Sequence, residues 1–363
     1  MELFHKILKT AVDGGASDIH IKPDAPVVYR ISSQLVETEM TQQPEEQWLQ
    51  KVIDNIVPEH FKQCLEEDRE IDFSYHVPDI GRFRTNCFQH LGKWCLAMRH
   101  VVAEVPNIDS LGLPEVIKTI AEAHRGIVMV AGTTGCGKST TLAGMINHIN
   151  TTQKRHIITL EDPVEYVFED NNCIIEQREI GLDTPSYTHS LKHIMRQDPD
   201  VIMIGEMRDA TSFRAAMSAA DTGHLVLSTL HTIDAPQSIS RMLDFFPADE
   251  RESVRKQMLG TIRAIIVQRM TVRKDGGVIP AIEIMINTST VSKLINENRL
   301  EKLHAAVETG TDDGMQNFNQ SLFQLVKDDI ITKEEALEKA TNAQALEMNF
   351  KGIFLSEGSR ILS

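Results

Sequence analysis

A glycine-rich loop between two apolar segments constrains this 363-residue chain more than any other feature. Residues 126–131 are apolar and strand-like, and they run directly into the pattern Gly132-x-x-x-x-Gly137-Lys138-Ser139. In such a loop, backbone N–H groups point inward around a chain of phosphates, the lysine reaches the outer phosphates, and the serine hydroxyl binds magnesium. Apolar residues at helical spacing follow in 140–149, which predicts that the phosphates lie at a helix N-terminus, where the dipole favours anions.

The motif therefore predicts ATP, or another nucleoside triphosphate, together with Mg²⁺. We expect the whole loop to bind the nucleotide: Gly132, Thr133, Thr134, Gly135, Cys136, Gly137, Lys138, Ser139 and Thr140.

Composition excludes several classes of protein. The chain has no run of about 18 apolar residues and no N-terminal signal peptide pattern, so we predict a cytoplasmic protein without a transmembrane segment. A net charge of −15 disfavours a motor that tracks nucleic acid, although it leaves a local basic groove open. Five cysteines without a C-x-x-C pair argue against a disulfide framework and a zinc knuckle. Cys136 is expected to be a small residue that fits the loop, with an oxidation switch as the alternative.

The order of elements predicts an α/β chain with several parts. Residues 1–103 alternate strand-like and helical runs, which is typical of a small α+β domain, and residues 104–114, with two prolines, indicate a linker. Residues 115–287 alternate strands with helices, which predicts a largely parallel sheet, and 288–350 are helical. Residues 351–363 are a weakly patterned tail. The predicted strands are 18–21, 27–31, 71–76, 82–88, 94–99, 126–131, 157–161, 173–177, 201–205 and 225–229. The N-terminal residues predict a short amphipathic helix that Gly14-Gly15 ends, and helical stretches are expected around 45–66. The other predicted helices are 139–150, 186–196, 211–221, 235–244, 288–297, 317–328, 332–340 and 342–350.

Acidic residues follow two of the predicted parallel strands. Glu206 comes just after the apolar run 201–204, and Glu161 ends the run 157–161. Because the carboxyl ends of parallel strands share one edge of the sheet, both carboxylates are expected near the phosphate loop. One would order Mg²⁺ and its water and the other would polarise the attacking water; the pattern does not decide which does which, and a solvated strand end is the alternative. Ser139 and Glu206, the latter directly or through water, are the predicted magnesium ligands.

Two histidines bracket the predicted apolar strand 225–229. His224 and His231 are seven residues apart and would point to opposite faces of an extended strand, so a shared metal is not expected. The polar residues around His231 favour it as a sensor of the γ-phosphate, whereas a packed or solvated histidine is the alternative.

Arginines near the end of the first domain form another group. Arg82 and Arg84 alternate along one predicted strand and share a face, with Arg99 on the next strand. Such residues can close on a nucleotide from another domain or subunit, or they can be surface arginines paired with nearby acids.

Four segments together resemble a known family: GTTGCGKST (132–140), ITLEDPVEY (158–166), DVIMIGEMRD (200–209) and TGHLVLSTLHT (222–232). They are similar to the Walker A motif, aspartate box, glutamate-bearing Walker B motif and histidine box of secretion-superfamily ATPases, in the same order. Further matches at 15–21, 81–86, 173–184, 195–200, 245–250 and 314–325 extend the likeness over nearly the whole chain. The greatest similarity is to the PilT/PilU group of type IV pilus retraction ATPases.

This resemblance implies a PAS-like N-terminal domain, a RecA-like P-loop ATPase domain and a helical C-terminal region. It also implies a hexamer that hydrolyses ATP and pulls pilin back through an inner-membrane platform protein at the pilus base. By motif position, Lys138 and Ser139 bind phosphate and magnesium, and Glu161 and Glu206 carry hydrolysis. His224 and His231 sense the nucleotide, and Arg84 and Arg99 approach it from the first domain.

One motif of the resemblance is altered. Retraction ATPases of the PilT type carry the sequence AIRNLI in the C-terminal region, where this chain reads Thr290-Val-Ser-Lys-Leu-Ile295. The change favours a PilU-like accessory subunit that associates with a PilT-type paralogue. A poorly hydrolysing regulatory subunit, a pilus-assembly or type II secretion ATPase, and a RecA-like nucleic-acid motor are the alternatives. The assembly and type II enzymes usually have an extra N-terminal domain and a tetracysteine insert, and we expect neither in this protein, so this alternative ranks behind.

Overall fold

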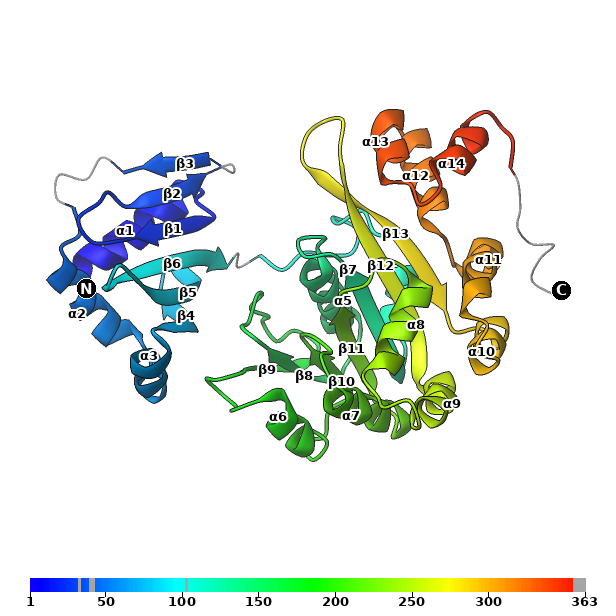
Figure 1. Ribbon diagram of the computed structural model, residues 1–363, viewed down its shortest axis with the longest axis horizontal. Coiled ribbons are helices and arrows are strands. Elements are labelled where there is room, and N and C mark those ends of the chain that lie inside the picture. The colour runs from blue at the N-terminus through cyan, green and yellow to red at the C-terminus, as the bar shows by residue number, and fades with distance from the viewer. Residues whose placement is uncertain (32–33, 39–42, 102–103, 355–363) are drawn as a thin grey trace. The chain divides into compact units, whose positions relative to one another are not determined.

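The computed structural model describes residues 1–31, 34–38, 43–101 and 104–354, and these form two compact units (Figure 1). Unit 1 comprises Met1–Glu104 with the short segments Asp162–Val167 and Gly181–Asp183, and unit 2 comprises the other described residues. Most of the predicted tail, residues 355–363, lies outside the described part of the chain.

Unit 1 is an antiparallel sheet with helices. Its strands follow the order β3-β2-β1-β6-β5-β4. Helix α1 buries Phe4, Ile7, Leu8 and Ala11, whose spacing of three and four residues places them on one face of the helix. The elements are α1 (Glu2–Asp13), β1 (Asp18–Ile21), β2 (Val28–Ile31), β3 (Gln34–Glu37), α2 (Glu46–Ile56), η1 (Glu59–Phe61), α3 (Lys62–Asp68), β4 (Glu70–Val77), β5 (Gly81–His90) and β6 (Lys93–Val101).

All the predicted strands of unit 1 are present, as β1, β2, β4, β5 and β6. The structure adds one strand, β3, that was not predicted. All four residues of β3 are exposed, so the strand has no alternation of buried and exposed positions. A period of two is the sequence signal of a half-buried strand, and β3 lacks it.

Unit 2 is built on a seven-stranded sheet in the order β13-β12-β7-β11-β10-β8-β9. The strands from β12 to β9 are paired in parallel, and β13 is antiparallel to β12. The strands are β7 (Gly126–Gly132), β8 (His156–Glu161), β9 (Ile174–Glu179), β10 (Val201–Ile204), β11 (Leu225–Leu230), β12 (Ile262–Val272) and β13 (Val278–Ile286). The mixed α/β fold predicted from the sequence is confirmed.

Helices cover both faces of this sheet. Along β7, Ile127 and Met129 belong to one buried cluster and Val128 and Val130 to another, because successive side chains of a strand point to opposite faces. The cluster of Val128 includes residues of α4 (Val116–Ala121) and α5 (Lys138–Thr152). The cluster of Ile127 includes residues of α6 (Tyr187–Ile194), α7 (Ala210–Asp221), α8 (Ala235–Asp244) and α9 (Arg251–Thr261).

Strands β12 and β13 were not predicted. The central residues of β12, Ala264–Val267, are all buried and apolar, so this stretch shows no alternation. A short, continuous apolar run cannot be distinguished from a buried helix by its periodicity. Tertiary pairing with β7 and β13 decides its structure.

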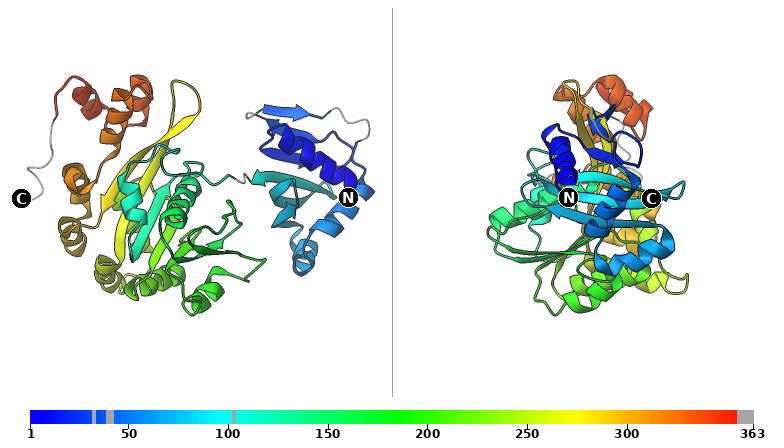
Figure 2. Two further views of the ribbon diagram at one scale, coloured as in Figure 1. Left: turned by 180° about the vertical axis from the view of Figure 1, so that it is seen from behind. Right: turned by 90° about the vertical axis from the view of Figure 1, so that its left-hand side faces the viewer.

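The C-terminal helices pack beside β12 and β13 (Figure 2). They are α10 (Ser289–Asn296), α11 (Leu303–Thr309), α12 (Phe318–Lys327), α13 (Lys333–Lys339) and α14 (Ala343–Phe350), with short 3₁₀ turns at η2 (Leu300–Lys302) and η3 (Thr311–Asp313). Four of these helices match the predicted ranges, whereas α11 was not predicted. Within the described residues, none of the helices has the length and apolar character to cross a membrane.

Candidate active site

The phosphate loop joins β7 to α5. Three of its glycines have positive φ: Gly132 (143°), Gly135 (80°) and Gly137 (84°). A Cβ atom at Gly132 would collide with the Sγ atom of Cys136 and lie 2.6 Å from the carbonyl oxygen of Gln268, so glycine is required there. Gly137 adopts the left-handed conformation at the N-cap of α5, which turns the loop directly into the helix.

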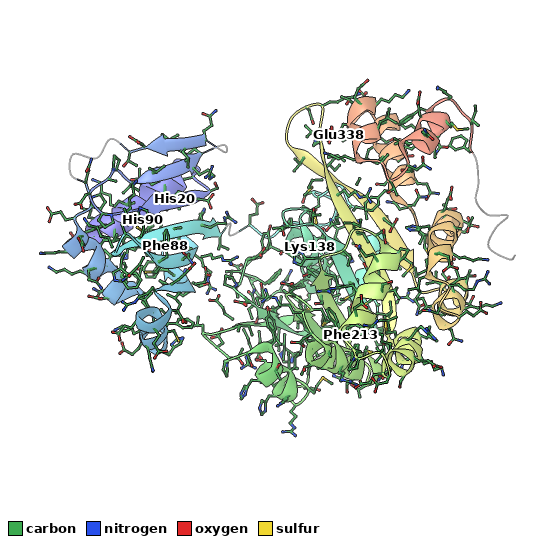
Figure 3. All side chains as sticks on the ribbon, in the orientation of Figure 1. His20, Phe88, His90, Lys138, Phe213 and Glu338 are labelled. Atoms are coloured by element: carbon green, nitrogen blue, oxygen red, sulfur yellow. The ribbon has the colours of Figure 1, made fainter. Side chains whose placement is uncertain are left out.

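Lys138 is the first residue of α5 (Figure 3). Its Nζ atom donates to the carbonyl oxygens of Gly132 at 3.0 Å and Thr133 at 3.1 Å, so the ammonium group lies against the loop. Ser139 and Thr140 follow in the first turn of α5 and are half-buried. The structure thus places a cation and two hydroxyl groups at the helix N-terminus, where the helix dipole favours phosphate.

The sheet order places three further strand ends beside this loop. Moving away from β7, the neighbouring strands are β11, β10 and β8, all parallel. Leu230 at the end of β11 pairs with Ala131, and Ile204 at the end of β10 pairs with Leu160. His231, Glu206 and Glu161 therefore come from three adjacent strands at the edge that carries the phosphate loop. Ligands of open α/β sheets bind at this edge.

Glu206 contacts two side chains at this edge, those of Arg208 and His231. Its Oε2 atom accepts from Nε of Arg208 at 2.9 Å, and Nη2 of the same arginine lies 2.9 Å away. Its Oε1 atom lies 3.5 Å from Nε2 of His231. Arg208 was not singled out from the sequence, although its position two residues after Glu206 in an extended segment is the signal that would have found it.

Glu161 is held in place from within the sheet. It is the last residue of β8 and is 6% exposed. Its Oε1 atom accepts from the hydroxyl of Thr159 at 2.7 Å and from Nε2 of Gln177 at 3.1 Å. Gln177 is on β9, the neighbouring strand. These bonds fix the orientation of the carboxyl group at the end of β8.

The two histidines lie at opposite ends of β11. His231 follows the carboxyl end of the strand and is close to Glu206, whereas His224 precedes the amino end. There, Nδ1 of His224 lies 2.9 Å from the carbonyl oxygen of Ala219 and 3.1 Å from Oγ1 of Thr222, at the end of α7. The structure does not bring His224 together with Lys138, Glu161 and Glu206 within this chain, and its sensing role stays a prediction.

Cys136 is a packed residue of the loop. It is 3% exposed. Burial raises the pKa of its thiol, and this effect outweighs the nearby Lys138 ammonium, which lowers it. A buried thiol with a raised pKa is poorly suited to an oxidation switch, because the thiolate is the reactive form.

Arg84 and Arg99 lie side by side in unit 1. They are direct cross-strand partners on β5 and β6. Nε of Arg99 donates to Oδ1 of Asp18 at 2.8 Å, and Nε of Arg84 lies 4.0 Å from Oδ1 of Asp72. Burial acts to raise the pKa of Asp18, but hydrogen bonds from Ser17 and Arg99 hold it below its ordinary value. Both arginines thus contact acids, as the alternative interpretation predicted, and both border a shallow hollow of unit 1.

The chemistry of the site agrees with a magnesium ion bound together with a nucleotide. Among the described residues, no group of three or more His, Cys, Asp or Glu side chains is arranged to hold a metal by itself. Magnesium bound to phosphates commonly takes only one or two protein ligands and keeps several waters. The hydroxyl of Ser139 and the carboxyl group of Glu206, the two predicted ligands, have hard oxygen atoms of the kind that suits magnesium.

Comparison with known proteins identifies the family. Residues 1–337 match the family described as "Type II/IV secretion system protein". The chain belongs to this family. It is 37% identical to the "Type IV pilus retractation ATPase PilT" of Pseudomonas aeruginosa over 92% of this chain and 97% of that protein. It is 36% identical to the "Type IV pilus ATPase PilU" of the same organism, over 96% of this chain and 91% of that protein.

A solved structure agrees with this assignment. The crystal structure of "the Pilus Retraction Motor PilT and Bound ADP" superimposes with a TM-score of 0.87 at 40% identity, covering 94% of this chain and 98% of that chain. The chain is therefore a nucleotide-binding P-loop ATPase of the PilT/PilU family within the type II/IV secretion proteins, as its motifs predicted.

Proposed function

We propose that this chain is a subunit of a hexameric ring that hydrolyses Mg-ATP to power retraction of a type IV pilus. One observation carries the proposal: the phosphate loop with Lys138 follows the carboxyl end of β7, and His231, Glu206 and Glu161 lie at the carboxyl ends of the next three parallel strands, at one edge of the sheet. The similarity to PilT, over nearly the full length of both proteins, supports the assignment of this edge to a retraction motor.

At this edge, the loop residues bind the phosphates. The backbone N–H groups of residues 132–138 and the Lys138 ammonium take the β- and γ-phosphates, and the Ser139 hydroxyl is a magnesium ligand. When bound, magnesium neutralises phosphate charge and orders water next to the γ-phosphate. The short contacts of Lys138 with the carbonyl oxygens of Gly132 and Thr133 keep its charge over the loop before the nucleotide arrives.

Glu206 is the residue that we assign to polarise the attacking water. It is partly exposed, which gives water access to the carboxyl group, whereas Glu161 is 6% exposed and held by Thr159 and Gln177. Glu161 is assigned to order the magnesium hydration shell. His231, next to Glu206, is positioned to respond to the γ-phosphate, and Arg208 balances the charge of Glu206 until catalysis.

Arg84 and Arg99 complete the site of a neighbouring subunit. Nucleotide binding closes the N-terminal domain of one subunit onto the ATPase domain of its neighbour, and hydrolysis releases it; such hinge closure converts nucleotide state into displacement. The ring acts on the inner-membrane platform protein of the pilus from the cytoplasmic side.

A second candidate is an accessory subunit of the PilU kind that joins a PilT-type ring. The observation that favours it lies in α10, where this chain differs from AIRNLI. Val291, Leu294 and Ile295 are buried and apolar, so the packing face of the helix is kept. Of these three, only Val291 differs from AIRNLI. The remaining differences are at Thr290, Ser292 and Lys293, and the side chains of Thr290 and Lys293 are exposed. They change what the outer face of α10 presents to a partner and leave the fold intact.

The test is magnesium-dependent ATP turnover per subunit as protein concentration is raised through the assembly range, for the wild type and for Glu206→Gln. A ring motor predicts specific activity that rises with concentration, and a Glu206→Gln variant that binds ATP and turns it over at least about 100-fold more slowly. Flat, near-zero turnover of the wild type, despite ATP binding, would reject the autonomous motor. Stimulation of a PilT-type ring by the same protein would then establish the accessory subunit.

A further inference from the structure

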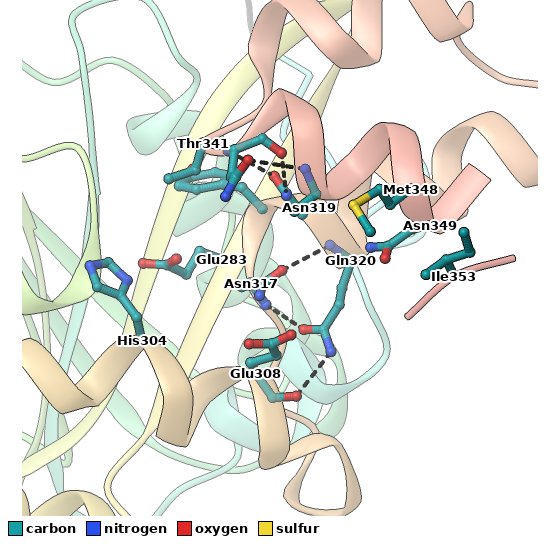
Figure 4. Close-up of a pocket in the computed structure, with 13 residues that line it drawn as sticks. Glu283, His304, Glu308, Asn317, Asn319, Gln320, Thr341, Met348, Asn349 and Ile353 are labelled. Atoms are coloured by element: carbon teal, nitrogen blue, oxygen red, sulfur yellow. Dashed lines mark hydrogen bonds between the residues drawn. The ribbon is translucent and has the colours of Figure 1, made fainter. Parts of the chain in front are cut away.

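A pocket of about 370 Å³ lies in the C-terminal part of unit 2 (Figure 4). Its walls come from β13, α11, α12 and α14, and none of its lining residues belongs to the phosphate loop, β8 or β10. Its volume is in the range of sites that bind small molecules or single side chains. The polar part of its lining includes Glu283, His304, Glu308, Asn317, Asn319 and Gln320.

The most unusual group in this lining is the carboxyl of Glu283, on β13. The residue is 3% exposed. Its Oε1 atom accepts from the backbone N–H of Ala235 at 2.8 Å, and this is the one donor to the group among the hydrogen bonds of the described residues. Burial raises the pKa of Glu283 to about 7. A buried carboxyl with a single donor is costly to ionise unless a positive group comes to it.

Arg269, the cation whose charge acts on Glu283, does not pair with its carboxyl group. The positive charge of Arg269 lowers the pKa of Glu283 from a distance, but among the described residues no hydrogen bond or ion pair joins the two side chains. Its Nη1 atom donates to the carbonyl oxygen of Lys339 at 3.0 Å and to Oγ1 of Thr341 at 2.9 Å, and Nη2 donates to the carbonyl oxygen of Ile233 at 3.2 Å. The guanidinium group also stacks over the ring of Phe318, 3.8 Å from its centroid. Arg269 thus braces the wall of the pocket.

Hydrogen bonds hold the walls in a defined shape. Asn317 and Gln320 form a capping box at the start of α12, and Nε2 of Gln320 donates to the carbonyl oxygen of Glu308 at 3.0 Å. Nδ2 of Asn319 donates to the carbonyl oxygen of Asn342, at the start of α14, at 2.8 Å. Figure 4 shows these bonds linking the elements around the pocket. A pre-organised site loses less entropy when a ligand binds.

The charge of the lining points to the class of ligand. The carboxyl group of Glu283, which has one hydrogen-bond donor, lies in the lining together with the imidazole of His304. Phe318 and Met348 supply apolar surface. We propose that this pocket binds a guanidinium or ammonium group on a short apolar stem, with Glu283 as its acceptor and Phe318 and Met348 against the stem. The proposal does not depend on the pilus or on ATP hydrolysis.

The test is isothermal titration calorimetry of the full chain with agmatine at pH 8, where the Glu283 carboxyl is ionised. We expect saturable binding, at least tenfold weaker binding to Glu283→Gln, and no comparable binding of pentylurea, which is a neutral analogue. The glutamine keeps an acceptor for the Ala235 N–H group. Binding that is equal in the wild type and Glu283→Gln, or no binding at 10 mM agmatine, would overturn the proposal.

Two further variants show whether a loss of agmatine binding comes from the pocket or from a change in folding. Ala345→Phe places a large side chain in the pocket without touching Glu283, and it should also weaken agmatine binding at least tenfold. Glu334→Gln removes an exposed carboxylate from α13, outside the pocket, and should bind agmatine as the wild type does. Unweakened binding by Ala345→Phe, or weakening by Glu334→Gln equal to that of Glu283→Gln, would count against this pocket.

A second probe distinguishes a free small cation from a basic side chain of a protein. It is an N-acetylated and C-amidated pentapeptide with one arginine between pairs of glycines. Binding of agmatine alone assigns the pocket to a free small cation. Binding of the peptide, with or without agmatine, assigns it to a basic side chain of a protein partner.

Discussion

Oε1 of Glu206 lies 3.5 Å from Nε2 of His231, at the ends of adjacent parallel strands. The contact arises because β10 and β11 run side by side in register, with Ile204 opposite Ser228. The imidazole is therefore next to the carboxyl group that we assign to polarise water. A change in the position of His231 on phosphate binding would be transmitted directly to Glu206.

We predict that His231→Ala lowers kcat by roughly tenfold or more, because Glu206 loses the neighbour that orients it, while ATP affinity stays within about twofold. We expect the loop around Lys138 to set the affinity, and among the described residues no hydrogen bond or ion pair joins His231 to this loop. Steady-state turnover and titration with a fluorescent ATP analogue measure the two quantities. His90→Ala, an exposed histidine of unit 1, is the matched control. Unchanged turnover of His231→Ala would refute this role.

The glycines of the phosphate loop should differ in their sensitivity to substitution. Gly132 and Gly135 both have positive φ, but a Cβ at Gly132 would strike Cys136 and the Gln268 carbonyl, whereas a Cβ at Gly135 would meet nothing within 4 Å. Gly132→Ala should therefore abolish ATP binding. Gly135→Ala should carry only the backbone strain of about 1 kcal/mol and keep a folded loop. Thermal unfolding, with and without Mg-ATP, distinguishes the two; equal loss of ATP stabilisation would show that the close contact at Gly132 is not decisive.

The sequence signals that predict a site at this edge are local. The loop pattern around Lys138, and acids directly after apolar runs, need only short segments and the rule that parallel strands end at one edge. The order of the strands in the sheet was not available from these segments. That order places β11 between β7 and β10, and it is the reason why His231 meets Glu206.

The features that sequence analysis missed depend on tertiary structure. Strand β12 is apolar on both faces and β3 is exposed on both, so neither shows a period of two. The position of His224 at the amino end of β11 follows from the direction of the strand, yet its contacts with Ala219 and Thr222 depend on how α7 ends. The pocket around Glu283 is assembled from four elements that are separated along the chain, and no motif marks it.

The five thiols should react in a defined order. Cys64 is exposed, and Cys87, Cys95, Cys136 and Cys173 are buried. Burial raises the pKa of each buried thiol, that of Cys87 to about 12. Since the thiolate is the reactive form, a disulfide reagent at pH 8 should label Cys64 rapidly and the others slowly. Stopped-flow labelling should show one fast phase that is missing in Cys64→Ser.

The same burial predicts that peroxide leaves ATP binding unchanged in the wild type, as it does in Cys136→Ser. Loss of ATP binding in the wild type alone would restore the oxidation switch at Cys136.

The stability of unit 2 should depend on the ionisation of Glu283. Burial raises its folded-state pKa to about 7, aided by Asp234 and opposed by the Ala235 N–H group and by Arg269. In the unfolded chain the pKa is near its ordinary value of about 4.3. The folded state therefore binds the extra proton between these values, and its stability falls as pH rises through this window. The full penalty, on the order of 3 kcal/mol, is present above pH 7.

Glu283→Gln removes this penalty, so the free energy of unfolding of the variant relative to the wild type should rise between pH 5 and pH 8. Urea unfolding followed by far-UV circular dichroism measures it, because both tryptophans, Trp48 and Trp94, are in unit 1 and do not report on unit 2. Glu334→Gln, an exposed carboxylate, should show no such slope. A difference between Glu283→Gln and the wild type that is constant over this range would mean that Glu283 is already ionised at pH 5 and that a cation compensates it.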